Sequence, residues 1–124
     1  MQQYLIIRSI YYKMSNLKPS RLYAVEDLFR VNNGEWIRTA GMLKKEENGK
    51  VFMLGIHDGR VEVNLTENLI EIHPGANYLV IGEYNELCVY ARIIREISFK
   101  KYSLAYYLGK MPDFLKVDNE NLDL

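Results

Sequence analysis

The chain has 124 residues, 48% of them apolar, with 16 Lys and Arg against 16 Asp and Glu and a single cysteine, Cys88. This length is typical of one domain, which can bury a core without metal or disulfide cross-links. One cysteine and two histidines exclude an internal disulfide and an ordinary structural zinc site, so we expect an intracellular protein. No apolar run approaches the roughly 20 residues of a membrane helix, which predicts a soluble chain.

Charge is divided unevenly along the chain. Residues 1–25 hold four basic residues and no acid, whereas residues 113–124 hold four acids and one lysine. A free-standing nucleic-acid binder usually carries a strong basic excess, because phosphate neutralisation supplies most of its affinity. The nearly neutral stretch between these ends therefore favours a role that depends on a partner.

Residues 1–19 form a predicted N-terminal arm. Their apolar stretch is interrupted by Arg8 and is followed by no small-residue cleavage site, which disfavours secretory and mitochondrial targeting. An extra edge strand, a frayed arm and an extension upstream of Met14 are the alternatives. Between residues 20 and 30 apolar residues recur at helical spacing, which fits a short helix or an irregular arm before the first strand.

Five strands are predicted after this arm, and glycine-containing turns separate the first three. The strands are expected at residues 36–43, 51–57, 60–65, 77–84 and 87–97. Gly41 lies inside the first strand and indicates a bulge or a sharp bend. Asn48-Gly49 and Asp58-Gly59 are turn signals, so the first three strands should form a meander. Asn85-Glu86 is expected to connect the last two strands.

Two further segments have helical spacing. Residues 66–72 predict a short helix between strands three and four, and a terminal helix ends before Pro112. This order predicts an all-β protein with flanking helices, namely a five-stranded OB-fold barrel with a short helix between strands three and four and a C-terminal helix. We expect the OB-fold domain over residues 20–111 and an acidic tail over residues 112–124.

Patterns that support enzymatic chemistry are missing from the sequence. There is no glycine-rich phosphate loop, no paired metal-ligand motif and no nucleophile elbow. His57 and His73 lie beside turns and are expected to be solvated, while Cys88 lies in an apolar strand and is expected to be buried and inert. We therefore expect no enzymatic activity, no metal site and no cofactor.

Two segments resemble a known family. Ile37–Leu43 (IRTAGML) and Pro74–Tyr84 (PGANYLVIGEY) resemble the first-strand and fourth-strand patterns of the smallest OB-fold subunit of the CST (Ctc–Stn–Ten) telomere complex. The chain length, the Arg21-Leu22-Tyr23 arm and the terminal helix also fit, so the resemblance covers residues 20–111. The smallest subunit of replication protein A and the small OB subunit of the RecQ-helicase accessory complex have similar layouts.

The resemblance implies a non-enzymatic accessory subunit. In that family the small protein pairs as a heterodimer with the N-terminal OB domain of a Stn partner, and the assembly binds single-stranded DNA at chromosome ends in the nucleus, supporting telomere end protection and replication. The matching positions form an apolar stripe on the terminal helix, with Tyr106 at its margin: Leu104, Tyr107, Leu108 and Met111. Such a stripe must cover the open end of its own barrel or enter a groove of another protein.

A self-sufficient oligonucleotide binder, or a small subunit of a replication or recombination complex, is the alternative. OB-folds stack bases on exposed aromatic side chains and track phosphates with Lys or Arg. The outward candidates are Trp36, Arg38, Lys44, Lys45, Arg60, Tyr90, Arg92 and Arg95. Arg38, Tyr90 and Arg92 should share a face if the first and fifth predicted strands adjoin. Placement of Trp36 in the core would weaken this prediction.

Overall fold

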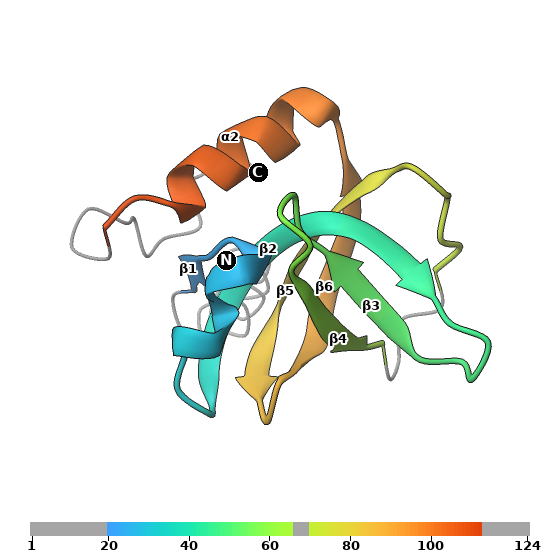
Figure 1. Ribbon diagram of the computed structural model, residues 1–124, viewed down its shortest axis with the longest axis horizontal. Helices are drawn as coiled ribbons and strands as arrows, with labels where there is room; N and C mark the ends of the chain where they lie inside the picture. The colour runs from blue at the N-terminus through green and yellow to red at the C-terminus, as the bar shows by residue number, and fades with distance from the viewer. Residues whose placement is uncertain (1–19, 66–69, 113–124) are drawn as a thin grey trace, which may run out of the picture.

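The longest strand of the molecule, β2 (Glu35–Lys45), curves across the whole sheet and contacts three other strands (Figure 1). The computed structural model describes residues 20–65 and 70–112. The other elements are β1 (Arg21–Leu22), the 3-10 helix η1 (Val25–Arg30), β3 (Val51–Leu54), β4 (Arg60–Asn64), β5 (Asn77–Asn85), β6 (Cys88–Ile97) and the helix α2 (Phe99–Gly109).

Pairing between β2 and β5 closes the sheet into a barrel. The strand order is β1-β2-β3-β4-β6-β5, and β2 pairs antiparallel with β5 from Glu35 opposite Tyr84 to Met42 opposite Asn77. β4 and β6 pair in parallel, and the remaining barrel pairs are antiparallel. This is the Greek-key order of an OB-fold, so the fold class predicted from the sequence is confirmed.

The barrel interior is filled by apolar side chains from every barrel strand. Ile37, Met53, Val80 and Val89 are completely buried there. Leu28 of η1 packs into the same core, so the predicted short helix or irregular arm before the first strand is a 3-10 helix that covers part of the barrel. A second buried cluster lies between the outer face of the sheet and α2.

Several predicted boundaries shift in the structure. The second strand ends at Leu54 rather than residue 57, because the Gly55 amide donates to the Gly59 carbonyl at 2.7 Å and closes the hairpin earlier. The last hairpin turn is centred on Glu86 and Leu87, both at positive φ, one residue later than predicted.

The predicted helix at 66–72 falls largely on residues 66–69, which lie outside the described residues. Ile70 to His73, which are described, are not helical, so the C-terminal part of that prediction is wrong. The predicted arm at 1–19 and the tail residues 113–124 also lie outside the described part of the chain.

The C-terminal helix ends before Pro112, as predicted, but does not include Met111. α2 starts after Ser98, whose hydroxyl accepts a hydrogen bond from the Lys101 amide at 3.2 Å, and it ends at Gly109, two residues before Met111. Such an N-cap satisfies a backbone donor that the first helical turn would leave unpaired. Within residues 20–65 and 70–112, no helix combines the length and apolar character needed to span a membrane.

Gly41 allows β2 to lie close to Met53 and Leu54 of the neighbouring strand β3. A Cβ atom at this position would overlap the carbonyl oxygen of Leu54 and lie 2.9 Å from Cγ of Met53. We expect Gly41→Ala to lower the free energy of unfolding by about 1–3 kcal/mol, as overpacking of cores does. Urea unfolding followed by circular dichroism measures this change.

Gly49→Asn is the matched control. Gly49 has φ 86° and open space around it, and asparagine tolerates this conformation, so stability should change little. Equal stability of Gly41→Ala and the parent chain would contradict the close approach described above.

Candidate partner and nucleic-acid interfaces

One side of α2 is anchored to the barrel. Tyr102 and Ala105 are buried against a patch on the outer surface of the sheet, which includes β1. That patch is made by Leu22, Ala40, Leu79 and Ile97. At the helix end, Lys110 Nζ lies 3.2 Å from a carboxylate oxygen of Asp27 in η1. A Cβ at Gly109 would lie 2.9 Å from the Ala24 amide nitrogen, so the absence of a side chain lets α2 contact the segment between β1 and η1.

The opposite side of α2 carries exposed apolar side chains. Leu104 is 48% exposed and Tyr107 is 68% exposed, and Phe99 at the start of the helix is 73% exposed. Leu104 and Tyr107 are three residues apart in the helix and therefore lie on one face. Of the predicted stripe, Leu104 and Tyr107 thus face outward together, and the exposed Phe99 at the start of α2 was not among the residues predicted from the sequence.

The rest of the predicted stripe is divided between the two sides. Leu108 is half-buried and packs against the cluster under α2, so it covers the protein's own barrel, one of the two alternatives for the stripe. Tyr106 is also half-buried, with its ring centroid 6.2 Å from that of His57 in the β3–β4 loop. Met111 lies beyond the helix and is half-buried. The face of a helix that packs inward depends on the surface beneath it, and here that surface accepts Tyr102 and Ala105.

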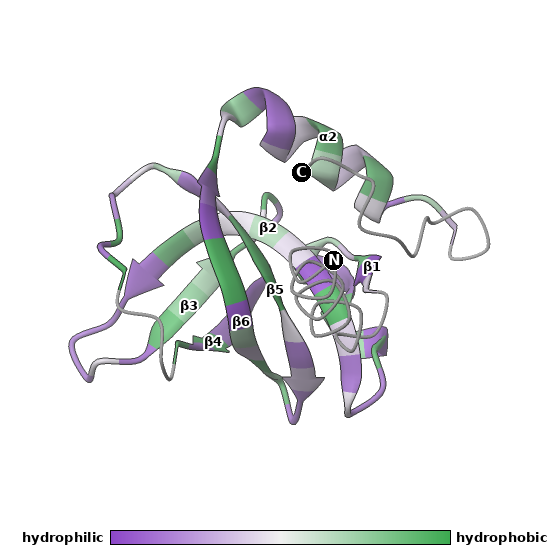
Figure 2. Ribbon diagram, turned by 180° about the vertical axis from the view of Figure 1, so that it is seen from behind, coloured by the Kyte–Doolittle hydropathy of each residue, from purple (hydrophilic) through white to green (hydrophobic). Residues whose placement is uncertain are grey.

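Basic and aromatic side chains gather on the β2–β3 hairpin and at the adjoining start of β4. This hairpin group consists of Lys44, Lys45, Lys50, Phe52 and Arg60. The guanidinium carbon of Arg60 lies 4.0 Å from the ring centroid of Phe52, a cation–π contact. Lys44 lies directly opposite Phe52 in the β2–β3 register. Figure 2 shows that the end of β2 and the following turn are hydrophilic. Lys44, Lys45 and Arg60 were predicted, whereas Phe52 and Lys50 were missed because only strand pairing brings them to the group.

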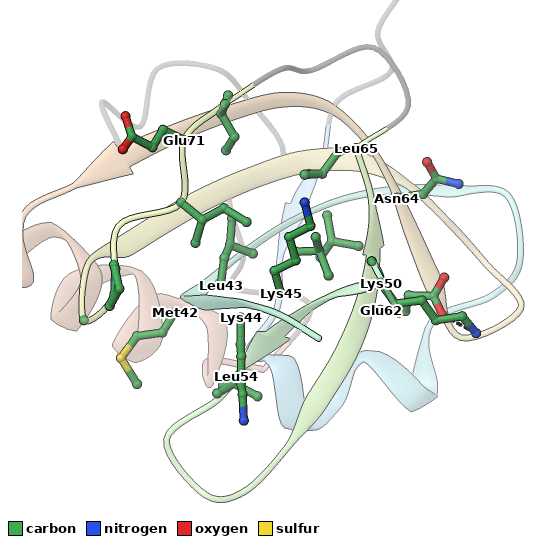
Figure 3. A pocket seen from close by; sticks show the side chains of 17 residues that line it. Met42, Leu43, Lys44, Lys45, Lys50, Leu54, Glu62, Asn64, Leu65 and Glu71 are labelled. Carbon is green, nitrogen blue, oxygen red and sulfur yellow. Dashed lines mark ion pairs between the residues drawn. The ribbon is translucent and has the colours of Figure 1, made fainter. Parts of the chain in front are cut away.

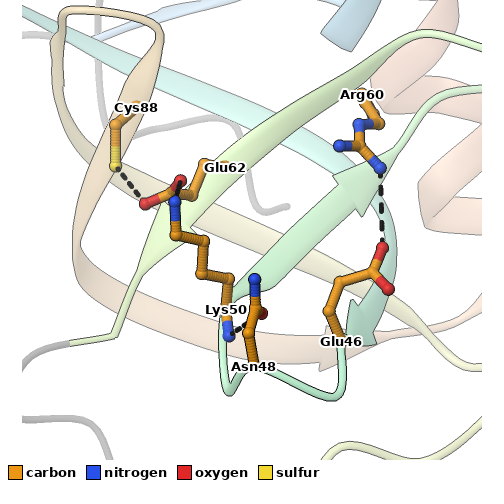
Figure 4. Close-up of polar contacts among 6 residues, drawn as sticks. All are labelled: Glu46, Asn48, Lys50, Arg60, Glu62 and Cys88. Carbon is orange, nitrogen blue, oxygen red and sulfur yellow. Dashed lines mark hydrogen bonds and ion pairs between the residues drawn. The ribbon is translucent and has the colours of Figure 1, made fainter.

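Carboxylates accompany these cations. Figure 4 shows Arg60 paired with Glu46 at 3.5 Å and Lys50 paired with Glu62 at 3.6 Å. No ion pair to a described residue is present at Lys44. The hairpin surface is therefore partly neutralised, and Lys44 is its cation most available to an anion.

Two predictions about the nucleic-acid candidates are wrong. Arg38 is only 3% exposed, and its Nε donates to the Ser20 carbonyl at 3.2 Å. It therefore ties the residue before β1 to β2 and does not face solvent. The first and fifth predicted strands, β2 and β6, do not adjoin, because β5 lies between them. Register places Trp36 opposite Glu83, and Glu83 opposite Tyr90.

The other candidates on β6 are separated from the hairpin group. Tyr90, Arg92 and Arg95 are exposed, and Trp36 is half-buried. Tyr90 is paired with Asn64 at the end of β4, away from the Arg60 end of that strand. The structure thus brings together Lys44, Lys45 and Arg60 with Phe52 and Lys50, whereas β4 lies between β3 and the candidates on β6.

A cleft opens at the end of the barrel beside this hairpin. Its volume is about 900 Å³, and it lies between the ends of β2, β3 and β4 and the segment 70–75. Most of its wall is aliphatic, and no aromatic residue lines it within the described residues. Lys44 and Lys45 point to opposite sides of β2, and Lys45 rises toward the side on which Leu65 lies (Figure 3).

The potentially reactive side chains do not form a site in the described residues. His57 and His73 are exposed in loops, as expected from the sequence. Cys88 is buried, and burial, followed by the nearby Glu62 carboxylate, raises the pKa of its thiol. A raised thiol pKa lowers the thiolate fraction and disfavours nucleophilic chemistry.

Comparison with known proteins relates this architecture to solved structures, although no family model and no curated protein sequence matches the chain. The telomere capping protein Ten1 from Saccharomyces pombe is 18% identical with a TM-score of 0.57, covering 68% of this chain and 91% of Ten1. A chain of the S. pombe Stn1-Ten1 complex is 17% identical with a TM-score of 0.56, covering 70% of this chain and 88% of that one.

A chain of U. maydis replication protein A bound to single-stranded DNA is also similar. It is 14% identical with a TM-score of 0.50, and the match covers 81% of this chain and 100% of that chain. The likeness to Ten1 and to replication protein A agrees with the resemblance found in the sequence. The chain therefore shares the OB-fold of these proteins.

Proposed function

We infer that this chain is a non-enzymatic accessory subunit of a single-stranded-DNA-binding complex and docks through α2 on a larger OB-fold partner. The observation that carries the proposal is the two-sided helix: Tyr102 and Ala105 hold it on the barrel while Leu104 and Tyr107 face outward. The likeness to Ten1 and to a chain of the Stn1-Ten1 complex supports a Stn-like partner.

The chemistry of the exposed face suits a protein partner. Tyr and Phe are enriched in protein interfaces, where large aromatic side chains fill pockets of the partner. A helix already fixed by Gly109 and Lys110 loses little freedom on docking, so more of the contact energy remains for binding. We further propose that the complex acts in the nucleus at chromosome ends and supports end protection and replication, a role supported by the likeness to a telomere capping protein.

Charge substitution on α2 tests the docking proposal. We expect Leu104→Glu combined with Tyr107→Glu to weaken binding to the N-terminal OB domain of the Stn-like protein at least about hundredfold. Each buried anchor of an interface contributes about 2 kcal/mol, and 1.4 kcal/mol corresponds to tenfold in affinity. Size-exclusion chromatography with light scattering, followed by calorimetric titration, measures the loss.

Leu87→Glu is the matched control, because Leu87 is an exposed apolar residue in the β5–β6 turn, away from α2 (Figure 1). It should bind the partner like the parent chain. If the parent chain shows no association, or if the α2 variant binds as well as the control, the docking proposal is wrong.

Direct contact with single-stranded nucleic acid is the second candidate function. The observation that favours it is the Phe52 and Arg60 pair beside Lys44, because the face of the second and third barrel strands is where OB-folds bind oligonucleotides. The likeness to a replication protein A chain bound to single-stranded DNA supports it further. Glu46 and Glu62 already pair with Arg60 and Lys50, so a phosphate would have to compete with these carboxylates. This contact would therefore supplement the nucleic-acid contacts of a partner subunit.

Salt-dependent titration tests this second function. We expect a fluorescein-labelled oligothymidine to bind the full chain at about 50 mM salt and much less at about 200 mM. Phe52→Ala should lower the affinity at least about fivefold through lost base stacking. Lys44→Ala should reduce the salt slope by about one. The control Lys100→Ala lies on α2 and should change neither; binding that ignores salt and both hairpin variants would rule the contact out.

A further inference from the structure

The end of β2 has one unpaired edge. Its pairing with β5 stops at Met42, whereas its pairing with β3 continues to Lys45 opposite Val51. Among the described residues, no strand and no backbone hydrogen bond reaches the β5 side of Leu43–Lys45. Three strand residues therefore present a free edge to the cleft described above.

The backbone groups on this edge can be assigned. The Glu46 amide donates to the Lys50 carbonyl at 2.7 Å, and the Gly49 amide donates to the Glu46 carbonyl, so Glu46 faces β3. Backbone groups of successive strand residues point to alternate edges, which directs those of Lys45 and Leu43 into the cleft. An unpaired strand edge of this kind is a template for another extended chain.

The cleft next to this edge has a largely apolar wall, and its charged lining consists of Lys44, Lys45, Lys50, Glu62 and Glu71. Glu62 lies 3.6 Å from Lys50 and Glu71 lies 3.8 Å from His73, which leaves Lys44 and Lys45 as the lining cations with no ion pair among the described residues. Leu65, Ile70 and Ile72 line the wall opposite the edge. Lys44 and Lys45 stand on the two sides of β2, and neither forms an ion pair with the described residues (Figure 3). Volumes of about 300–1,000 Å³ are typical of ligand sites, and this cleft falls in that range.

We propose that the Leu43–Lys45 edge of β2 binds an extended acidic peptide segment of a partner protein as an added strand. Charge complementarity determines the peptide: an aliphatic side chain lies opposite Leu43, and carboxylates lie opposite Lys44 and Lys45. Main-chain hydrogen bonds to the edge supply affinity, and the alternate side-chain positions supply specificity. The site uses other residues than the outward face of α2 and does not depend on partner docking there.

A peptide fits this cleft better than a nucleic-acid strand does. The described lining has no aromatic ring on which a base could stack, and base stacking is a main source of affinity for single strands. A nucleotide backbone also lacks the regular amide donors that would pair with the carbonyls of Leu43 and Lys45. The aromatic group at Phe52 belongs to the outer face of the hairpin.

Anisotropy titration of the full chain with a labelled synthetic peptide tests the proposal. The probe is Val-Glu-Glu-Val-Glu-Glu, which offers the required order in both strand directions. We expect it to bind at least about tenfold more tightly than Val-Lys-Lys-Val-Lys-Lys, a difference of about 1.4 kcal/mol. Methylation of the second and fourth amide nitrogens of the peptide should lower the affinity at least about tenfold, because amides two residues apart point to the same strand edge and would pair with Leu43 and Lys45.

Two double variants with the same charge change locate the site. Lys44→Glu with Lys45→Glu should lower peptide affinity at least about tenfold, whereas Lys100→Glu with Lys101→Glu on α2 should leave it within about twofold. The proposal is overturned by equal affinity for the acidic and basic peptides, by equal loss in the two double variants or by indifference to N-methylation. Displacement of the peptide by an oligothymidine of equal or higher affinity would assign the cleft to nucleic acid instead.

Discussion

Closure of the sheet by β2 and β5 is the constraint from which the other surfaces follow. Once β2 gives one edge to β5 from Glu35 to Met42, its other edge is shared by β1 and then β3. The interior is then filled by strand side chains and η1, so α2 can pack only on the outside. Within the described part of the chain, the three residues of β2 beyond Met42 are unpaired on the β5 side, because β5 begins at Asn77.

The outside position of α2 explains why one helix can serve two surfaces. A small barrel has one core, and a helix that lies on its outer face buries only a narrow strip against it. Tyr102 and Ala105 make up that strip with the close approach at Gly109, and the rest of the helix surface faces away from the barrel. The apolar residues there, Leu104 and Tyr107, are more than the fold requires, which is why they indicate a partner.

The neutral net charge of the chain conceals local separation. At the β2–β3 hairpin, strand pairing aligns Lys44 with Phe52 and Phe52 with Glu62, so cations, an aromatic ring and carboxylates alternate across a single face. Because Arg60 and Lys50 already have carboxylate partners, an anionic ligand there must compete with them. Lys44 and Lys45 have no such competitor among the described residues, and they border both the hairpin surface and the cleft.

The sequence by itself determined the features that rest on neighbouring residues. Asn48-Gly49 and Asp58-Gly59 specify turns through positive φ at Gly49 and Asp58, and period-two patterns between them predict strands. The five strands, the terminal helix and hence the OB-fold could be predicted in this way. Their boundaries moved by a few residues where a hydrogen bond across the chain, such as that between Gly55 and Gly59, ended an element early.

Only the tertiary structure decided which side chains meet. The burial of Arg38 results from Ser20 and β1 beside β2, and the separation of Tyr90 from the β2–β3 hairpin results from the intervening β4. Phe52 became part of the candidate surface because the guanidinium of Arg60, on the neighbouring strand β4, reaches over its ring. Local periodicity specifies how each segment folds, whereas contacts between distant segments depend on pairing order and register, which no single segment encodes.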